Sequence, residues 1–498
     1  MKALGDYIDG RFILTENPSG QIHSIDPGNI KNKIGSYAYS YDHVSQAVHA
    51  AKSAFPKWAR LSIEERAGFF KKFSSEIETH FNELSALISH ETGKPLWEAK
   101  QETQGLLGKI HITLGEGLNI ISEKEVPHAQ PNILGRYRFK PKGVMVVLGP
   151  FNFPAHLPHG HYIPALLTGN TVIFKPSEKT PAVGQFIAEL VHRSGFPNGV
   201  FNMIQGEKEV GKRLVMSDVN GILFTGSYEV GLQIKKETVS HYWKTIVLEM
   251  GGKNASIVLD DADLTKALYE NVMGAYLTTG QRCSATSRLI LTAHIADIFL
   301  KSFHDLSKKL NIGYAFDETE PFMGPLISKE AQENYIRFQG IAQREGGETI
   351  MRGKALDLKY IGYYVTPSIY LMKPSMRTSI YLSTEIFGPS VGVIVVKNID
   401  EAIEEANRTD YGLAVSVFTK DKRSYEHVFR ETKAGIVNWN RSTSGGSPKL
   451  PFGGQGKSGN QCPTALFAPF YCTYPVASLE DELPVDLNKL PPGIMNDV

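Results

Sequence analysis

A carboxylate and a thiol stand out as residues that could carry out covalent chemistry. Glu249 opens the run Glu249-Met-Gly-Gly252, and Cys283 lies in Gly280-Gln-Arg-Cys-Ser284. A thiolate is a good nucleophile, and a carboxylate held apart from it can activate water without neutralising it. Polar and cationic neighbours such as Arg282 suit the thiolate form. The residues therefore predict attack by Cys283 and water activation by Glu249, with a buried, inert thiol as the alternative.

Three loops that follow short apolar segments could bind a dinucleotide. They are Gly149-Pro-Phe-Asn-Phe-Pro154, Lys175-Pro-Ser-Glu178 and Thr225-Gly-Ser-Tyr-Glu-Val-Gly231. If the preceding segments are parallel strands, all three loops lie at one edge of a sheet. Gly226, Ser227 and Gly231 would offer backbone N–H groups to a pyrophosphate at a helix start, although an ordinary strand-to-helix turn has the same pattern. Glu178 could accept ribose hydroxyls and would repel a 2′-phosphate, which favours NAD over NADP.

The sequence disfavours two other kinds of site. Gly206–Arg213 nearly matches a P-loop, but Arg213 stands where a Ser or Thr should bind magnesium, and Pro451–Ser458 fails at its first position. His156, His159 and His161 have a spacing that fits no common zinc motif. We predict neither a nucleoside triphosphate site nor a metal site.

The composition limits the class of protein. The 498 residues are 42% hydrophobic and 21% charged, which is enough to bury at least two cores. The 53 basic and 52 acidic residues create no global field that would attract nucleic acid or a membrane, so a small-molecule partner is expected. Three irregularly spaced cysteines, no signal peptide and no apolar run of about 20 residues predict a soluble cytoplasmic protein.

Segments with the pattern of buried strands alternate with helical patterns in two parts of the chain. In the first part the strands are predicted at Val144–Leu148, Thr171–Phe174, Val200–Ile204, Ile222–Thr225 and Ile246–Leu248, with a helix at Pro181–His192. This alternation is typical of a parallel, doubly wound sheet. A second α/β unit is predicted from strands at Ser256–Leu259, Val391–Val396, Ala414–Phe418 and Gly435–Trp439, with a helix at Asp400–Asn407.

The N-terminal part, the segment around Tyr137 and the C-terminal tail give further expectations. Asp42 is predicted to cap one helix, and Ser62 with Glu65 forms a capping box at the start of another. Alternation around Tyr137-Arg-Phe139 predicts an exposed strand pair that serves an interface. The tail after Cys462 is expected to be an arm packed on a neighbour or a loose end.

Together these residues resemble the aldehyde dehydrogenase superfamily over nearly the whole chain. The matching motifs are Phe151-Asn-Phe-Pro154, Lys175-Pro-Ser-Glu178, Phe224-Thr-Gly-Ser227, Glu249-Met-Gly-Gly252, Gly280-Gln-Arg-Cys283, Glu385-Ile-Phe-Gly-Pro389 and Pro451-Phe-Gly-Gly454. The resemblance implies an α/β fold in three parts and a homodimer or homotetramer. The parts are a doubly wound NAD-binding domain (1–120 and 139–249), an α/β catalytic domain (250–440) and a small β bridging or oligomerisation element (121–138 and 461–498).

The resemblance also implies the chemistry, which is NAD-dependent oxidation of an aldehyde. Cys283 would attack the carbonyl carbon, Glu249 would activate the hydrolytic water, and Asn152 with the Cys283 N–H would form the oxyanion hole. By the same resemblance the cofactor would be bound by Phe151, Lys175, Ser177, Glu178, Gly226, Ser227, Gly231, Glu385 and Phe387.

A finer resemblance is to family members that oxidise N-succinylglutamate 5-semialdehyde in arginine breakdown. It rests on His156-Leu-Pro-His-Gly-His161, Val437-Asn-Trp-Asn440 and the tail Tyr471–Leu479. Such a substrate carries carboxylates, so Arg282 and Arg441 are expected to bind it. The alternatives are an NAD(P)-dependent dehydrogenase of another aldehyde, a thiol hydrolase without a dinucleotide, and a non-catalytic member of the family.

Overall fold

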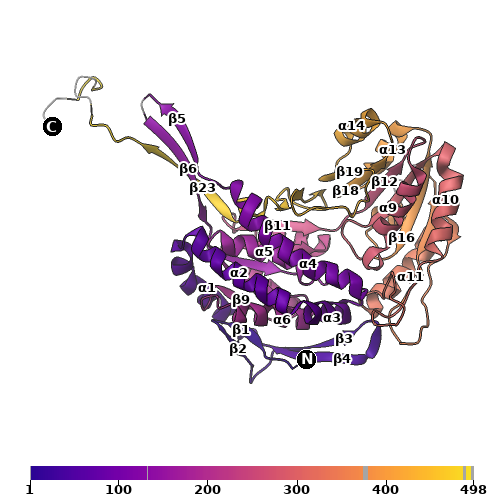
Figure 1. Ribbon diagram of the computed structural model, residues 1–498, viewed down its shortest axis with the longest axis horizontal. Coiled ribbons are helices and arrows are strands. Elements are labelled where there is room, and N and C mark those ends of the chain that lie inside the picture. The colour runs from indigo at the N-terminus through magenta and orange to yellow at the C-terminus, as the bar shows by residue number, and fades with distance from the viewer. Residues whose placement is uncertain (1, 132, 374–378, 486–489, 495–498) are drawn as a thin grey trace.

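Two seven-stranded sheets form the frame of the computed structural model, which describes residues 2–131, 133–373, 379–485 and 490–494 (Figure 1). The strands of the first sheet are, in spatial order, β11 (Thr245–Met250), β10 (Gly221–Gly226), β7 (Val144–Leu148), β8 (Thr171–Lys175), β9 (Phe201–Met203), β1 (Asp6–Ile8) and β2 (Arg11–Ile13). From β11 to β9 all neighbours are parallel, and the strand order reverses between β7 and β10. The predicted doubly wound sheet is confirmed, and its switch point lies where ligands of such sheets bind.

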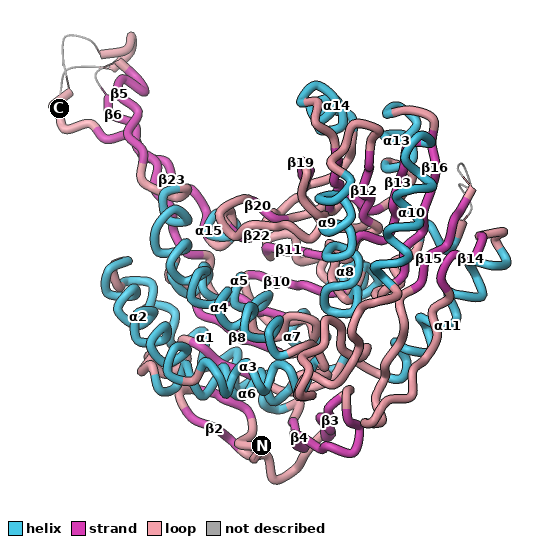
Figure 2. Tube along the Cα trace, turned by 45° about the vertical axis from the view of Figure 1, so that its right-hand side comes forward, coloured by secondary structure: helices cyan, strands magenta, loops and turns pink. Residues whose placement is uncertain are grey.

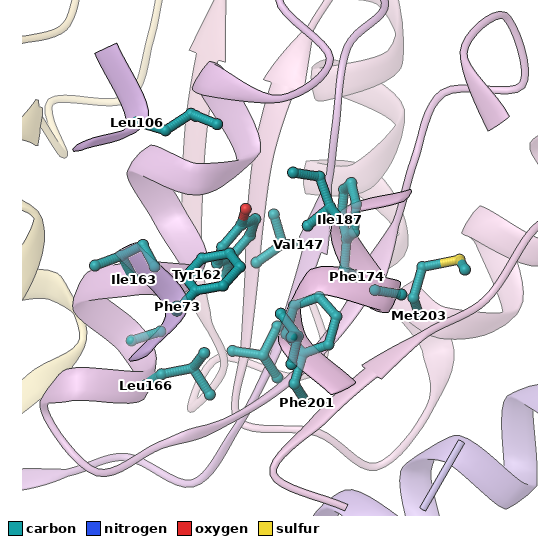
Figure 3. Close-up of a cluster of buried hydrophobic side chains, with 14 of the residues drawn as sticks. Phe73, Leu106, Val147, Tyr162, Ile163, Leu166, Phe174, Ile187, Phe201 and Met203 are labelled. Carbon is teal, nitrogen blue, oxygen red and sulfur yellow. The ribbon is translucent and has the colours of Figure 1, made fainter. Parts of the chain in front are cut away.

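Helices cover both faces of this sheet, because its strands are apolar on both sides. One face packs against α2 (Ile63–Thr79), α3 (Phe81–Thr92), α4 (Leu96–Ile112), α5 (His156–Leu167) and α6 (Pro181–Arg193). The other packs against α1 (Asp42–Arg60), α7 (Lys208–Met216) and α8 (Tyr228–Glu237). Figure 3 shows the first core, in which Phe73 of α2, Leu106 of α4 and Tyr162 of α5 gather over Val147 and Phe174 of the sheet.

The second sheet has the same layered plan. Its strands are, in spatial order, β14 (Glu348–Met351), β15 (Ser368–Met372), β16 (Ser390–Val396), β13 (Thr286–Thr292), β12 (Asn254–Val258), β18 (Ala414–Phe418) and β19 (Ile436–Trp439). All neighbours are parallel except β14 and β15. One face packs against α9 (Leu264–Tyr276) and α10 (Ala293–Ser307), and the other against α11 (Lys329–Arg344), α12 (Ile380–Ser383), α13 (Ile399–Ala406) and α14 (Lys422–Glu431).

A three-stranded antiparallel sheet projects from the body of the molecule (Figures 1 and 2). It consists of β5 (Lys124–Gln130), β6 (Ile133–Pro141) and β23 (Thr473–Glu480), with β6 in the middle. The predicted strand pair is confirmed, and the tail supplies a third strand by pairing with β6 of its own chain. The predicted boundary between 138 and 139 falls inside β6. Of the segments expected here, 132, 486–489 and 495–498 lie outside the described residues.

Nine further elements complete the described chain. They are β3 (Gly20–Asp26), β4 (Asn29–Tyr39), η1 (Thr113–Gly117), η2 (Leu277–Gly280), β17 (Tyr411–Gly412), β20 (Pro451–Phe452), β21 (Gln455–Gly456), β22 (Thr464–Ala465) and α15 (Ala468–Tyr471). None of the helices in the described residues is long and apolar enough to cross a bilayer.

The two predicted helix caps have different outcomes. The capping box is confirmed, because Ser62 Oγ accepts from Glu65 N at 3.1 Å and Glu65 Oε2 accepts from Ser62 N at 2.6 Å. The prediction for Asp42 is wrong by one residue: Tyr41 occupies the cap and Asp42 is the first helical residue. There its carboxylate still complements the positive end of the helix dipole.

Candidate active site

The segment Glu249–Gly252 contacts two loops of the site, the loop of Glu385 and the loop of Cys283. Glu249 lies near the end of β11. A Cβ atom on Gly251 would lie 1.9 Å from Glu385 Oε2, and one on Gly252 would lie 2.5 Å from the carbonyl oxygen of Cys283. Both approaches are closer than any side chain allows. These two glycines therefore let the Cys283 loop and the Glu385 loop pack directly against the end of the first sheet.

The Cys283 loop is held in an unusual backbone conformation. Thr278 and Thr279 have φ angles of 53° and 56°, in the left-handed region that non-glycine residues rarely adopt. Gly280 follows with φ 70°, and a Cβ there would lie 2.4 Å from the carbonyl oxygen of Gly388. The turn ends where Asn254 Nδ2 donates to the Cys283 carbonyl at 2.7 Å. The thiol is thus presented by a loop that packing and hydrogen bonds fix at both ends.

The electrostatics of Cys283 differ from the expectation. Burial raises the pKa of its thiol to about 12, and the carboxylates of Glu385 and Glu249 add to this effect. Arg282 acts in the opposite direction, but its Nη2 is 2.5 Å from Glu98 Oε1. The prediction that the polar and cationic neighbours favour a thiolate is wrong, because burial and the two carboxylates outweigh the charge of Arg282. The thiol is held in its protonated form.

Asn152 connects the first sheet to the Cys283 loop. It lies between β7 and α5, is 5% exposed, and donates from Nδ2 to the carbonyl oxygen of Gln281 at 2.8 Å. A side-chain amide nitrogen carries two N–H groups. One of them fixes the side chain against the loop, so the second can donate to an oxygen atom that approaches Cys283.

Glu249 is a buried carboxyl group that lacks a full set of partners. It is 5% exposed, and its Oε2 has no hydrogen-bond partner among the residues that the structure describes. Burial raises its pKa well above the usual value for glutamate. A Cβ on Gly453 would lie 2.9 Å from Glu249 Oε1, so the segment Pro451–Gly454 covers the carboxyl group. A buried acid with an elevated pKa and a vacant oxygen suits proton transfer.

Glu385 and Phe387 lie on the loop that follows α12. Glu385 Oε1 accepts from the backbone N–H of Gly252 at 2.9 Å, and burial raises the pKa of this carboxyl to about 7. Phe387 has φ 55°, and its ring meets that of Phe151 edge-on with centroids 5.8 Å apart. The structure thus brings Phe151 into contact with Phe387, and so joins two separate predicted motifs, Phe151–Pro154 and Glu385–Pro389.

Lys175, Ser177 and Glu178 lie at the end of β8. Lys175 Nζ donates to the carbonyl oxygens of Pro176 and Gly206, each at 2.7 Å, and burial lowers the pKa of this lysine. Its third N–H remains for a ligand. The exposed carboxylate of Glu178 is 4.0 Å from Nζ, and Ser177 Oγ accepts from the backbone N–H of Lys179 at 3.2 Å.

Gly226, Ser227 and Gly231 lie where β10 leads into α8. Ser227 Oγ accepts from Val230 N at 3.4 Å and so caps the helix, whose first residues are exposed. The sequence suggested that the N–H of Gly231 would be free to bind a pyrophosphate. Instead it donates to Ser227 O at 3.0 Å. Glycine allows close packing there, since a Cβ would lie 2.4 Å from Met250 Sδ.

Arg282 and Arg441 are both ion-paired. Arg282 pairs with Glu98, and its Nε also donates to Thr278 Oγ1 at 2.8 Å. Arg441 Nη1 donates to Glu270 Oε1 at 2.9 Å, yet 65% of its side chain is exposed. Arg441 is therefore the more accessible of the two cations.

Sequence patterns did not reveal three charged residues at the start of α4, which are Lys94, just before the helix, and Glu98 and Glu102 within it. Their spacing of four residues was visible, but on a helix such a pattern usually marks a solvated face. All three are at most 3% exposed and contact the loops of Asn152 and Cys283. No group of three or more His, Cys, Asp or Glu residues able to hold a metal occurs in the described residues.

A dinucleotide fits the edge of the first sheet. The unused N–H of Lys175 and the exposed start of α8 suit ribose and phosphate oxygens. The close packing at Gly231 keeps α8 against β11, so that its N-terminus lies at the same edge. Glu385 is near enough to Cys283 for its carboxylate to raise the pKa of the thiol, and a carboxylate there could accept ribose hydroxyl groups.

Comparison with known proteins agrees with this geometry. Residues 14–465 match the aldehyde dehydrogenase family. The chain is 39% identical over 497 residues to the N-succinylglutamate 5-semialdehyde dehydrogenase of Legionella pneumophila (strain Corby), covering 99% of this chain and 98% of that one. A similar solved structure is 1-pyrroline-5-carboxylate dehydrogenase from Thermus with bound NAD (TM-score 0.89, 31% identity, 96% and 93% of the chains). Another is PnpE in complex with nicotinamide adenine dinucleotide (TM-score 0.91, 33% identity, 97% and 98%).

Proposed function

Because the chain belongs to the aldehyde dehydrogenase family, we propose that it oxidises N-succinylglutamate 5-semialdehyde to N-succinylglutamate with NAD. The observation that carries the chemistry is the hydrogen bond from Asn152 to the carbonyl of Gln281, which holds an amide donor beside the Cys283 loop. The Legionella relative, 39% identical, supports the choice of aldehyde. The two solved structures with bound dinucleotide support NAD.

The proposed reaction begins when the Cys283 thiol gives up its proton to solvent and its sulfur attacks the aldehyde carbon, which gives the oxyanion of a thiohemiacetal. The free N–H of Asn152 and the backbone N–H of Cys283 stabilise the negative charge that develops on the oxygen. NAD, held by the residues at the ends of β8 and β10 and by Glu385, supplies the hydride acceptor when bound. As the C–H electron pair leaves as hydride, the oxyanion re-forms the carbonyl group, and a thioester remains on Cys283.

Glu249 completes the turnover by removing a proton from the water that attacks the thioester. Its vacant Oε2 is the acceptor, and its elevated pKa makes it a stronger base than a free glutamate once ionised. The products are the carboxylate and the free thiol. The carboxylates of the substrate would be met by Arg441, which is exposed, and by Arg282 to the extent that its pairing with Glu98 allows.

The proposal extends to the arrangement of the chain. The first sheet with its helices would form the NAD-binding domain, the second sheet the catalytic domain, and β5, β6 and β23 the bridging element of a homodimer or homotetramer. Every residue of β5 is exposed, which supports an interface there. Three free cysteines support a reducing, cytoplasmic setting.

A kinetic panel tests the proposed function. The aldehydes are N-succinylglutamate 5-semialdehyde, glutamate 5-semialdehyde, succinate semialdehyde and propanal, each with NAD and NADP. We expect the highest kcat/KM for the succinylated aldehyde with NAD, by at least about tenfold, since one charge-assisted contact is worth about that factor. A higher kcat/KM for propanal would contradict the substrate. NADH formation with none of the four, together with no thermal stabilisation by NAD, would favour a thiol hydrolase.

A further inference from the structure

Helix α4 carries a buried row of charges that reaches both loops of the candidate active site. Lys94, just before the helix, and Glu98 and Glu102 on its first turns lie four residues apart and so share one side. Their side chains are almost entirely buried, and each finds an oppositely charged partner. Such groups are costly to bury, so a row of them beside a reactive centre calls for an explanation.

The first contact of this row is with the Asn152 loop. Lys94 Nζ donates to the carbonyl oxygen of Asn152 at 2.7 Å and to Glu102 Oε2 at 2.6 Å. Glu102 Oε1 in turn accepts from the backbone N–H groups of Ala155 and His156, both at 3.0 Å. These bonds fix the backbone on both sides of Phe153. They leave the Asn152 side chain little freedom to move relative to α4.

The second contact is with the loop that leads to Cys283. Glu98 Oε2 accepts from the backbone N–H of Thr278 at 3.1 Å. Glu98 Oε1 accepts from Arg282 Nη2 at 2.5 Å and also from the Thr278 hydroxyl. Burial opposes ionisation, but the charges of Arg282 and Lys94 and these hydrogen bonds hold the pKa of Glu98 below its usual value. An ionised carboxylate thus pins the left-handed turn at Thr278.

The ring of Phe153 joins the two contacts. Lys94 Nζ lies 3.9 Å from its centroid, and the guanidinium carbon of Arg282 lies 5.0 Å from it. Two cations on one ring are tolerable only because Glu102 and Glu98 balance them. The two cations and two carboxylates, with Phe153 between them, form one unit that we name the α4 clamp.

We propose that the α4 clamp sets the spacing of the oxyanion hole, with Glu98 as a positioning residue for Cys283 and the Lys94–Glu102 pair as positioning residues for Asn152. The inference rests on the proposed function for its catalytic meaning. The two donors of the hole belong to loops far apart in sequence, and one rigid helix holds both. The clamp also withholds the charge of Arg282 from the thiol.

The test compares Glu98→Gln with Glu404→Gln, a matched control in which an exposed glutamate pairs with Arg408 on the surface. The rate of Cys283 alkylation by iodoacetamide is measured against pH in the protein without aldehyde or NAD, and the modified cysteine is identified by peptide mass spectrometry. In Glu98→Gln the unpaired Arg282 should stabilise the thiolate, so the profile should move to lower pH while kcat falls by about tenfold or more. Glu404→Gln should match the wild type in both.

Two further outcomes keep the proposal open to refutation. If Glu98→Gln has the wild-type alkylation profile, the clamp does not position the thiol, whether or not kcat falls. If Glu98→Gln does not fold, Thr278→Val decides. It removes the hydroxyl that donates to Glu98 and accepts from Arg282 Nε, but it leaves both charged groups in place. We expect kcat to fall by about fivefold or more, the equivalent of at least one hydrogen bond, and an unchanged kcat would overturn the proposal. The alkylation assay needs no aldehyde, so a wild type that forms no NADH would refute the proposed function alone.

Discussion

The α4 clamp and the candidate catalytic centre are neighbours, yet they treat buried ionisable groups in opposite ways. In the clamp each buried charge is paired, and Glu98 is held ionised by Arg282 and Lys94. In the centre, Glu249 has an oxygen without a partner in the described chain, and the pKa values of Glu249 and Cys283 are raised by burial. Paired charges build a rigid frame, whereas unpaired groups remain available for proton transfer.

This difference indicates which parts of the site lower the stability of the fold and which parts restore it. A buried carboxyl group without hydrogen-bond partners destabilises the fold, and so does a left-handed backbone at threonine. The clamp and the glycines of Glu249–Gly252 supply the packing and hydrogen bonds that hold these features in place. Substitutions in the catalytic centre can each be compared with the substitution of Glu98 in the clamp.

The largest effect is expected for Cys283→Ala. Without the sulfur no covalent intermediate can form, so turnover should fall to background, about 10⁵-fold or more. NADH absorbance in steady state and in a single turnover measures it. The control is Cys472→Ala, which removes a buried thiol of the core and should leave kcat near that of the wild type. Residual NADH formation by folded Cys283→Ala would contradict the assignment.

Glu249→Gln should slow turnover by about 10³-fold while preserving the first round of NADH formation. The amide cannot accept a proton from water, so the thioester should accumulate. Stopped-flow absorbance with excess NAD and aldehyde should show about one NADH per active site, followed by a slow phase. Equal loss of the fast and the slow phase would place Glu249 before hydride loss.

Asn152→Ala should lower the rate of the first turnover by about 10²-fold, since it removes one donor of the oxyanion hole. The same change breaks the bond to Gln281, so the thiol alkylation rate serves as a second readout. We expect the affinity for NAD, measured by fluorescence quenching, to stay within about twofold. A large loss of NAD affinity would instead indicate collapse of the loop.

The pH dependence should be the most gradual effect. The pKa of Glu249 is raised, so its base form is scarce at low pH and grows as pH rises through that pKa. Steady-state kcat should therefore increase with pH, by less than about tenfold per unit. In Glu249→Gln this rise should disappear from the deacylation phase. Activity that falls with rising pH over the same interval would contradict a carboxylate base.

Much of this arrangement could be predicted because its signals are local. The strand at Val144–Leu148 is predicted to the residue, since five apolar residues in a row require burial on both faces. The strands β13 and β15 were missed. β13 begins with Thr-Ser-Arg, and Arg288 is buried only because its guanidinium donates to carbonyls of Lys253, Glu405 and Ala406. Such partners cannot be seen in a single sequence.

In the candidate site, too, local features could be predicted from the sequence and distant partners could not. Cys283, Glu249 and Asn152 could be found from their types and motifs, but whether Arg282 would act on the thiol depended on Glu98, which is 184 residues away. The pKa values of Cys283 and Glu249 arise from burial among elements of both sheets. Sequence patterns identify the reacting groups, whereas three-dimensional packing determines their protonation.

The most direct test of the account is to trap the covalent intermediate. Glu249→Gln is mixed with N-succinylglutamate 5-semialdehyde and NAD, quenched in acid within the first turnover, and examined by intact-protein and peptide mass spectrometry. The account predicts an adduct on Cys283 with the mass of the aldehyde less two hydrogens, in the same amount as the NADH formed. NADH without an adduct on Cys283, or an adduct on another residue, would contradict it.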